Sequence, residues 1–186
     1  MMQRRCGPGP LETKFCDFEG ALALTEGAEI AGYASLFGTA DKGGDVVQKG
    51  AYAASLARLA TARSGVRMLW QHDPTKPIGV WDEVREDGRG LWVKGRLLLD
   101  LRLAHEAYVL LQAGAIDGLS IGYRTLRSEK AAGGGRLLHE IELWEVSLVT
   151  FPMLPEARVQ ADPIDLDPDL ARVIAESFRE ARQLLA

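Results

Sequence analysis

The sequence predicts a mostly β domain of the α+β class, in which the strands form a barrel that carries three helices. Apolar runs of strand length recur between residues 11 and 160, separated by turns rich in Gly, Pro and Asp. Three other segments place their apolar residues at helical spacing. A length of 186 residues suits one domain with a real core, and 47% hydrophobic with 26% charged residues is ordinary globular composition.

Charge and composition argue against several classes of function. A net charge of −4 gives no electrostatic support for binding nucleic acid or an anionic membrane. Residues 7–10 are Gly-Pro-Gly-Pro where a signal peptide needs an apolar run, and no apolar stretch approaches the roughly 18 residues of a membrane span. Cys6 and Cys16 form no disulfide framework, and no metal, P-loop or dinucleotide motif occurs. We therefore expect a cytoplasmic protein without a cofactor, metal, membrane or nucleic-acid partner.

The first third of the chain predicts strands followed by one helix. Residues 1–10 are polar and rich in Pro and Gly, which predicts a mobile tail. The strand-like runs are residues 11–24, 28–37 and 46–47. Residues 51–62 predict an amphipathic helix, because Tyr52, Leu56 and Leu59 share one helical face.

The next segment predicts a short strand and a hairpin. Residues 66–70 form a β-type run, and we expect it to stop at Asp73 because Pro74 removes that residue from helical geometry and ends the strand. Residues 77–84 and 90–99 predict a hairpin, since the Asp-Gly pair between them is a favoured hairpin turn.

A helix and two long strands follow. Residues 101–113 predict a helix that ends at Gly114, which suits a C-cap. Residues 119–128 and 136–149 predict strands joined by a flexible turn with three consecutive glycines.

The C-terminal segment predicts a last amphipathic helix. Asp167 is a suitable N-cap and Pro168 suits the first helical position. Its apolar face would consist of Leu170, Val173, Ile174, Phe178, Ala181 and Leu185. We therefore divide the chain into a tail at residues 1–10, a folded domain at 11–160, and a helix at 161–186 that packs on the domain or docks a partner.

Ser120 is the candidate nucleophile. It lies in a Gly-x-Ser-x-Gly string, a pattern that exposes a serine on a tight turn, although a chain with 20 glycines can contain such a string by chance. In α/β-hydrolases the pattern follows a strand and opens a helix, whereas the flanking residues here predict helix, turn and strand. An esterase of that fold is therefore disfavoured, and a serine hydrolase would need another scaffold.

A nucleophilic serine needs a base, and the chain offers three histidines. His105 lies within a predicted helix beside Glu106, which is typical of a solvated surface residue. His139 lies in a long strand, where a structural role is favoured over a catalytic one. His72 follows an apolar strand in a proline-fixed turn, where functional groups are often displayed, although the residues alone leave a structural role equally open.

Glu145 is the candidate for the third member of a triad. Alternation along its strand places Glu145 on one face with Leu143 and Ser147, and a carboxylate on an apolar face is costly unless it is paired. It could hold an imidazole by a charge-assisted hydrogen bond, or be an edge-strand charge that blocks aggregation. Asp73 and Asp117 stay open as alternatives, although Asp117 is more typical of a turn former.

Several stretches in this order resemble the prohead, or capsid maturation, proteases of tailed phages. They are Gly50-Ala51-Tyr52 at a helix start, Leu69-Trp70-Gln71-His72-Asp73, Gly118-Leu119-Ser120-Ile121-Gly122-Tyr123 and Leu143-Trp144-Glu145-Val146-Ser147-Leu148-Val149. The resemblance covers about residues 30–159 and is far more specific than any one motif. That family is similar in fold to the herpesvirus assemblins, which implies a small closed barrel of about seven strands wrapped by helices.

The resemblance also implies roles for residues. His72 matches the family's general base and Ser120 its nucleophile. Glu145 stands where assemblins carry a second histidine, and the phage branch accepts glutamate there. The implied enzyme is a serine endopeptidase with a His-Ser-Glu triad and no cofactor.

The implied substrate is scaffold protein, the scaffolding region of the major capsid protein, or the protease itself, cleaved inside the assembling procapsid in the bacterial host cytoplasm. Likeness to assemblins raises the expectation of a homodimer. The source would be a phage, a prophage or a gene transfer agent. The competing hypothesis is a non-enzymatic capsid-assembly factor on the same fold, which would have no use for the Ser120, His72 and Glu145 set.

Overall fold

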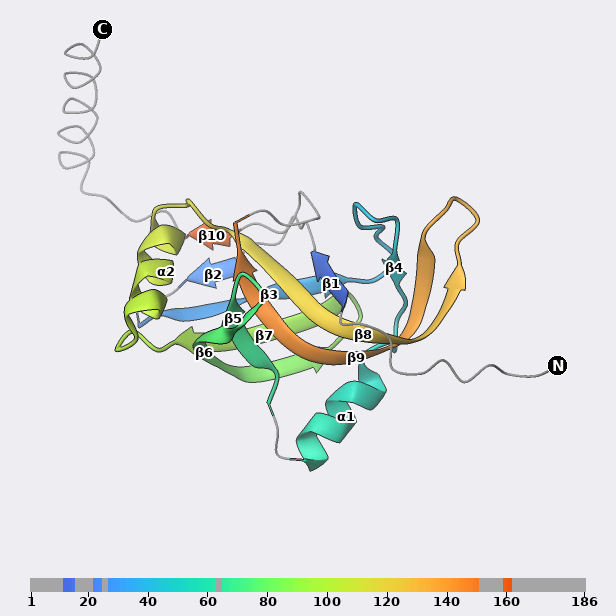
Figure 1. The fold of residues 1–186 in the computed structure, drawn as a ribbon, viewed down its shortest axis with the longest axis horizontal. Helices are drawn as coiled ribbons and strands as arrows, with labels where there is room; N and C mark the ends of the chain where they lie inside the picture. Colours follow the sequence, from blue (N-terminus) through green and yellow to red (C-terminus); the bar gives the residue numbers. More distant parts are fainter. Residues whose placement is uncertain (1–11, 16–21, 25–26, 63–64, 151–158, 162–186) are drawn as a thin grey trace, which may run out of the picture.

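The computed structural model describes residues 12–15, 22–24, 27–62, 65–150 and 159–161, and ten strands of this part join in one sheet with two helices attached (Figure 1). The strands are β1 (Glu12–Phe15), β2 (Leu22–Leu24), β3 (Glu29–Leu36), β4 (Val46–Val47), β5 (Arg67–Trp70), β6 (Asp73–Glu86), β7 (Gly90–Leu97), β8 (Gly118–Lys130), β9 (Arg136–Val149) and β10 (Val159–Ala161). The helices are α1 (Ala53–Thr61) and α2 (Arg102–Gln112).

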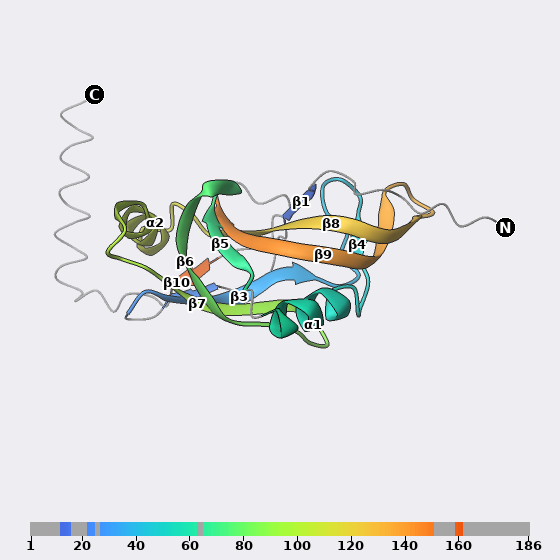
Figure 2. The same cartoon turned by 60° about the horizontal axis from the view of Figure 1, so that its bottom comes forward.

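The sheet is curled into a half-barrel. Its strand order is β1-β8-β9-β5-β6-β7-β3-β2-β10, and β4 pairs with β9 outside this path. The β8–β9 ribbon arches over the β3–β7–β6 part, as the two views in Figures 1 and 2 show, and buried apolar side chains from both parts form one core. Pairings between the described strands leave β1 and β10 as the two ends of the path, so closure of the barrel stays a prediction.

The strand count exceeds the expected seven for identifiable reasons. Within the described residues, the single strand expected at residues 11–24 is two strands, β1 and β2, which pair with different partners. The strand β10, parallel to β2, was not expected at all. Local composition could not separate these cases, because both depend on partners far away in sequence.

The strand expected at residues 66–70 is confirmed as β5, which ends at Trp70, but the next strand begins before Pro74 and not at residue 77 as expected. Strand β6 begins at Asp73, pairs it with Trp70, and runs through two prolines to Glu86. A residue before proline is restricted to extended geometry, which is what a strand requires. The missing N–H groups are accommodated by register shifts in the β5–β6 pairing beside Leu69. The hairpin predicted after it is confirmed, with Asp87 N–H donating to Gly90 O at 3.0 Å.

Both helices expected within the described residues are confirmed. Helix α2 ends in a left-handed Gly114 (φ 66°), and the N–H groups of Gly114 and Ala115 donate to the carbonyls of Leu111 and Leu110, the Schellman pattern. The tail at residues 1–10 and the helix from Asp167 lie outside the described residues. No helix in the described ranges has the length and apolar character that crossing a membrane requires.

Helix α1 closes a gap in the edge of β9. Strand β4 pairs with β9 at one end and β5 pairs with it at the other. Between them, α1 and the residue just before its N-cap accept N–H groups of β9. Ile141 N–H donates to Ala51 O at 3.1 Å, and Leu143 N–H donates to Ser55 Oγ at 2.9 Å. The helix therefore fixes β9 just before Glu145.

The start of α1 is held by a distant carboxylate. Glu86 on β6 accepts the N–H groups of Gly50 at 2.5 Å and Tyr52 at 3.2 Å, in place of a side-chain cap from the helix itself. A carboxylate at this end also complements the positive end of the helix dipole.

Candidate active site

Three adjacent strands bring the candidate residues together. In the antiparallel β8–β9 pair, Ser120 lies opposite Ser147 and Gly122 lies opposite Glu145. Strand β5 flanks β9 on its other side, and its end at Trp70 leads into the turn that carries His72. The three residues predicted from sequence therefore meet on one face of the sheet, although they come from different parts of the chain.

The contacts form a continuous chain from serine to carboxylate. Ser120 Oγ lies 2.6 Å from His72 Nε2, and His72 Nδ1 lies 2.5 Å from Glu145 Oε1. Ser120 is fully buried, Glu145 is 8% exposed and the His72 side chain is 16% exposed. A carboxylate acceptor at Nδ1 favours the tautomer with its proton there, so that Nε2, unprotonated, can accept the serine proton. This is the arrangement of nucleophile, base and orienting acid used in acyl transfer.

The turn that carries His72 has an unusual backbone. Gln71 (φ 53°) and His72 (φ 61°) are both left-handed, and they form the two-residue loop between Trp70 and Asp73. Positive φ at both central residues is typical of a type I′ hairpin turn, but without glycine it is costly and persists only where surrounding contacts enforce it.

Contacts to the end of β9 hold this turn. Gln71 N–H donates to Leu148 O at 2.9 Å, His72 N–H donates to Ser147 Oγ at 3.2 Å, and the Gln71 side-chain amide donates to Thr150 Oγ1 at 2.6 Å. Strand β9 therefore supplies both the carboxylate and the supports of the imidazole.

Strict alternation along β9 is wrong at one point. Gly122 pairs with Glu145 but Tyr123 pairs with Leu143, so Trp144 is an extra residue in a β-bulge. Leu143 and Val146 both lie in the core, three residues apart, and Glu145 therefore does not share the face of Leu143 as expected. The bulge shifts the phase of the strand and directs Glu145 toward the turn at His72.

The alternative residues have other roles. The carboxylate of Asp73 accepts Thr75 Oγ1–H and N–H and lies 2.9 Å from Lys76 Nζ, and these contacts lower its pKa to about 2. His139 pairs with Glu129 at 2.7 Å, and His105 is exposed on α2. Asp117 precedes β8. The geometry therefore favours Glu145 over the other acids and His72 over the other histidines.

Sequence reasoning assigned no role to Ser147, which the structure places at the centre of the site. Ser147 is fully buried, and its hydroxyl donates to Glu145 Oε2 at 2.5 Å while accepting the His72 N–H. The available signal was its spacing of two residues from Glu145 on one strand, which puts both side chains on the same face.

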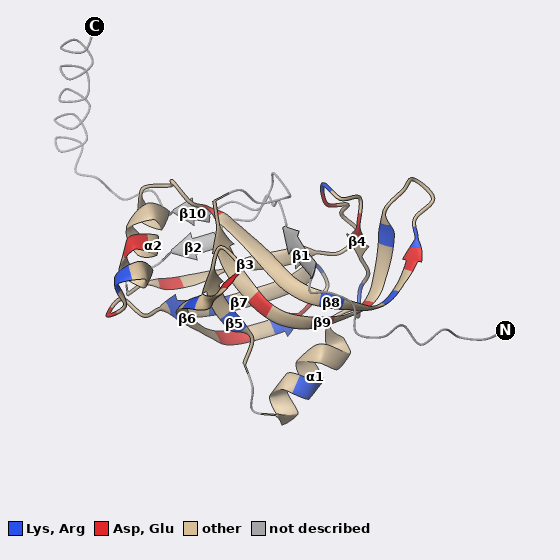
Figure 3. Ribbon diagram, viewed as in Figure 1, with Lys and Arg blue, Asp and Glu red and all other residues tan. Residues whose placement is uncertain are grey.

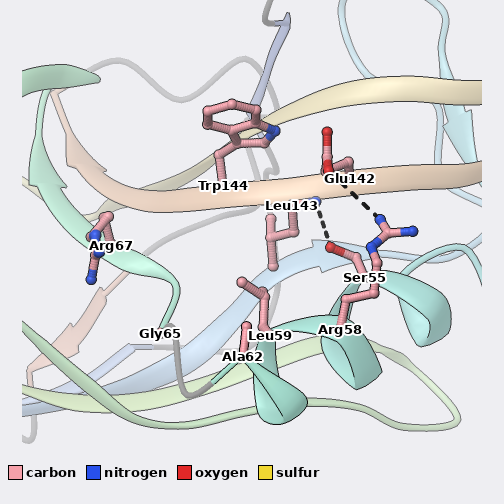
Figure 4. A pocket seen from close by; sticks show the side chains of 9 residues that line it. All are labelled: Ser55, Arg58, Leu59, Ala62, Gly65, Arg67, Glu142, Leu143 and Trp144. Carbon is pink, nitrogen blue, oxygen red and sulfur yellow. Dashed lines mark hydrogen bonds and ion pairs between the residues drawn. The ribbon is translucent and has the colours of Figure 1, made fainter.

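A surface hollow of about 530 Å³ lies beside the site, between α1 and the strands β5 and β9 (Figure 4). Its lining residues are Ser55, Arg58, Leu59, Ala62, Gly65, Arg67, Glu142, Leu143 and Trp144. Arg67 is the β5 neighbour of Glu145, so the hollow adjoins the site, but Ser120, His72 and Glu145 do not line it.

Basic and acidic residues are interspersed along the described strands and helices (Figure 3). On β9 beside the hollow, for example, Glu142 lies 3.8 Å from Arg58 and 3.5 Å from Arg124. Among the described residues, no group of three or more His, Cys, Asp or Glu side chains is arranged to hold a metal ion.

The profile of the caudovirus prohead serine proteases matches residues 18–168, most of the chain. The chain belongs to this family. Over 133 residues it is 32% identical to the prohead protease of Enterobacteria phage HK97. The matched segment covers 70% of this chain and 58% of that protein. Over 102 residues it is 32% identical to the capsid polyprotein of Pseudomonas phage PAJU2, covering 50% of this chain and 15% of that protein.

A solved structure shares the fold of this prohead protease family member. The bacteriophage T4 capsid assembly protease superposes with a TM-score of 0.58 at 13% identity, and the match covers 75% of this chain and 96% of that chain. At this identity the likeness concerns the fold alone. The chain spans 58% and 15% of the lengths of the two relatives matched by sequence.

Proposed function

We propose that this member of the prohead protease family acts as a serine endopeptidase through Ser120, His72 and Glu145. The observation that carries the proposal is the continuous contact chain from Ser120 Oγ through both His72 ring nitrogens to Glu145 Oε1. Membership of a serine protease family supports the same reaction class. A purely structural assembly factor on this fold would not require a buried serine, an imidazole and a carboxylate in this order.

The reaction would follow from these positions. Ser120 Oγ attacks the carbonyl carbon of the scissile peptide while His72 Nε2 takes its proton, and Glu145 stabilises the resulting imidazolium. His72 then gives that proton to the leaving amine nitrogen as the C–N bond breaks, which leaves an acyl-enzyme. Water attacks the ester, its proton passes to His72 and then to Ser120 Oγ, and a carboxylic acid departs.

The substrate we propose is scaffold protein or the scaffolding region of a major capsid protein, cleaved inside the procapsid within the host cytoplasm. The names of the relatives support this choice, since one is a prohead protease and the other a capsid polyprotein. Processing of the chain itself and formation of a homodimer belong to the same proposal.

Co-expression with the cognate capsid protein tests this function. Intact mass spectrometry would compare the capsid protein made with the wild type and with Ser120→Ala. Shortening with the wild type alone is expected. Full-length capsid protein in both cases, in particles that still assemble, would favour the assembly factor. Cleavage that persists with Ser120→Ala would show that another residue is the nucleophile.

A further inference from the structure

Ser147 connects the two parts of the site that must stay aligned, and this inference rests on the proposed function. We propose that Ser147 is a positioning residue, which locks the Glu145 carboxylate to the turn that carries His72. Its hydroxyl contacts the backbone N–H of His72 and the carboxylate of Glu145, so its effect on the reaction would pass through these two neighbours.

The hydrogen bonds form a closed ring. His72 N–H donates to Ser147 Oγ, whose own proton is donated to Glu145 Oε2, while the other carboxylate oxygen meets His72 Nδ1. A hydroxyl has one proton and two acceptor lone pairs, so Ser147 can fill both roles at once. The ring therefore ties the imidazole of His72 to its own backbone through two other side chains.

Two features make such a tie necessary. His72 has a left-handed backbone without glycine, a conformation that surrounding contacts must enforce. Glu145 has a long side chain whose end can rotate, and Ser147 holds the oxygen that His72 does not. Without the hydroxyl, a partly buried N–H and a carboxylate oxygen would each lose a partner.

The position of Ser147 in the sheet explains why it can do this. It lies opposite Ser120 on β8 and beside Leu69 on β5, at the centre of the three strands. It is fully buried, so water does not compete for its hydroxyl. Displacement of a reacting group by about 1 Å can cost about 10²-fold in rate, and we expect a loss of this order in Ser147→Ala.

The test uses diisopropyl fluorophosphate as the probe, because the natural substrate need not be known. Ser120 Oγ forms a bond to phosphorus, fluoride leaves, and the serine proton passes to His72. The rate of phosphorylation is followed by intact mass across a range of pH for the wild type, Ser147→Ala, Ser147→Thr and Ser147→Cys. Ser128→Ala, an exposed position on β8, is the matched control.

A second readout does not depend on reactivity. The proton between His72 Nδ1 and Glu145 should give a far-downfield NMR signal in the wild type, assigned by its absence in Glu145→Gln. This signal should broaden or vanish in Ser147→Ala and return in Ser147→Thr, which keeps a hydroxyl. A residue that only filled space would leave the signal and the pH profile unchanged.

The expected result is labelling slowed about 10²-fold in Ser147→Ala with an altered pH profile, recovery in Ser147→Thr, and no change in Ser128→Ala. Wild-type labelling and an unchanged His72 signal in Ser147→Ala would overturn the inference. If the alanine variant does not fold, the comparison of Ser147→Cys with Ser147→Thr takes its place. Labelling of Ser120 is then expected to be slower in the cysteine variant, and equal labelling rates would overturn the inference. A folded wild type that is never labelled would instead contradict the proposed function, and the NMR comparison would still decide the role of Ser147.

Discussion

Gly122 leaves the space that the Glu145 carboxylate occupies. The two residues lie opposite each other on β8 and β9, and a Cβ added at Gly122 would lie 2.1 Å from Glu145 Oε1, the oxygen that meets His72. The second glycine of the Gly-x-Ser-x-Gly string therefore has a reason unrelated to a tight turn, because it admits a carboxylate from the neighbouring strand.

Gly122→Ala should strongly reduce reactivity. The new methyl group must displace the carboxylate, so we expect fluorophosphate labelling of Ser120 to fall by about 10²-fold or more, with overpacking that costs about 1–3 kcal/mol of stability. Gly133→Ala is the control, since a Cβ there meets no heavy atom within 4 Å. Equal labelling of both variants would show that Glu145 is not needed where the structure places it.

Glu145→Gln tests the carboxylate more directly. The amide keeps the shape but removes the charge and can donate to Nδ1, which favours the wrong imidazole tautomer. We expect cleavage of the capsid protein, or labelling of Ser120, to fall by about 10⁴-fold, with little change in the thermal midpoint. A loss below tenfold would mean that another group orients His72.

Ser55→Ala tests the support that α1 gives to β9. Ser55 is buried and accepts the Leu143 N–H at 2.9 Å, so its removal leaves a buried donor without its partner. We expect the free energy of unfolding, measured with urea, to fall by about 1–3 kcal/mol. Thr61→Ala on the exposed side of the same helix should change it by less than about 0.5 kcal/mol. Alanine has the higher helix propensity, so a similar loss in both variants would show that the Ser55 hydrogen bond is not its cause.

Asp87 predicts an acid-sensitive contribution to stability. Burial alone would raise the pKa of its carboxyl, but hydrogen bonds from Arg89 N–H, the Tyr33 hydroxyl, Gly90 N–H and Arg85 outweigh it and lower this pKa from 3.8 to about 2. The folded state therefore favours the ionised carboxylate. Asp87 contributes to the free energy of unfolding above about pH 4, and this contribution is lost as the pH falls toward 2.

The comparison of wild type with Asp87→Asn measures this contribution. The difference in their unfolding free energies should stay constant above about pH 4 and shrink as the pH falls to 2. Other acidic groups affect both proteins alike and cancel in the difference. A difference in unfolding free energy that does not change between about pH 4 and pH 2 would contradict the lowered pKa of Asp87.

The sequence was sufficient for elements whose signal is local. The helices at Ala53–Thr61 and Arg102–Gln112 follow from apolar spacing, and the turn after Glu86 follows from its Asp-Gly pair. Features that depend on distant partners were not predictable. The bulge at Trp144 exists because of its pairing with β8. Strand β6 starts before Pro74 because β5 pairs with it from Asp73, and β7 pairs with it only from Gly79 onward.

The candidate site divides in the same way. His72 and Ser120 were identified by residue type and by a resemblance. The structure brings Ser120 into contact with His72, and His72 into contact with Glu145. The face assigned to Glu145 was wrong, because alternation cannot anticipate a bulge. The contribution of Ser147 was missed, since a serine within an apolar strand carries no chemical signal until its neighbours across the sheet are known.

The parallel pairing of β5 with β9 also determines at which stage of folding the site can form. The contact of His72 with Glu145 joins residues 73 apart in sequence, and that of Ser120 with His72 joins residues 48 apart. Pairings between such distant segments close late in folding, because the loop entropy is lost before the contacts form. During synthesis, moreover, Ser147 must leave the ribosome before β9 can pair with β5 and contact the turn that carries His72. A nascent or half-folded chain would therefore carry Ser120 without its proposed base, and the proposed nucleophilic reactivity would begin only with the completed sheet.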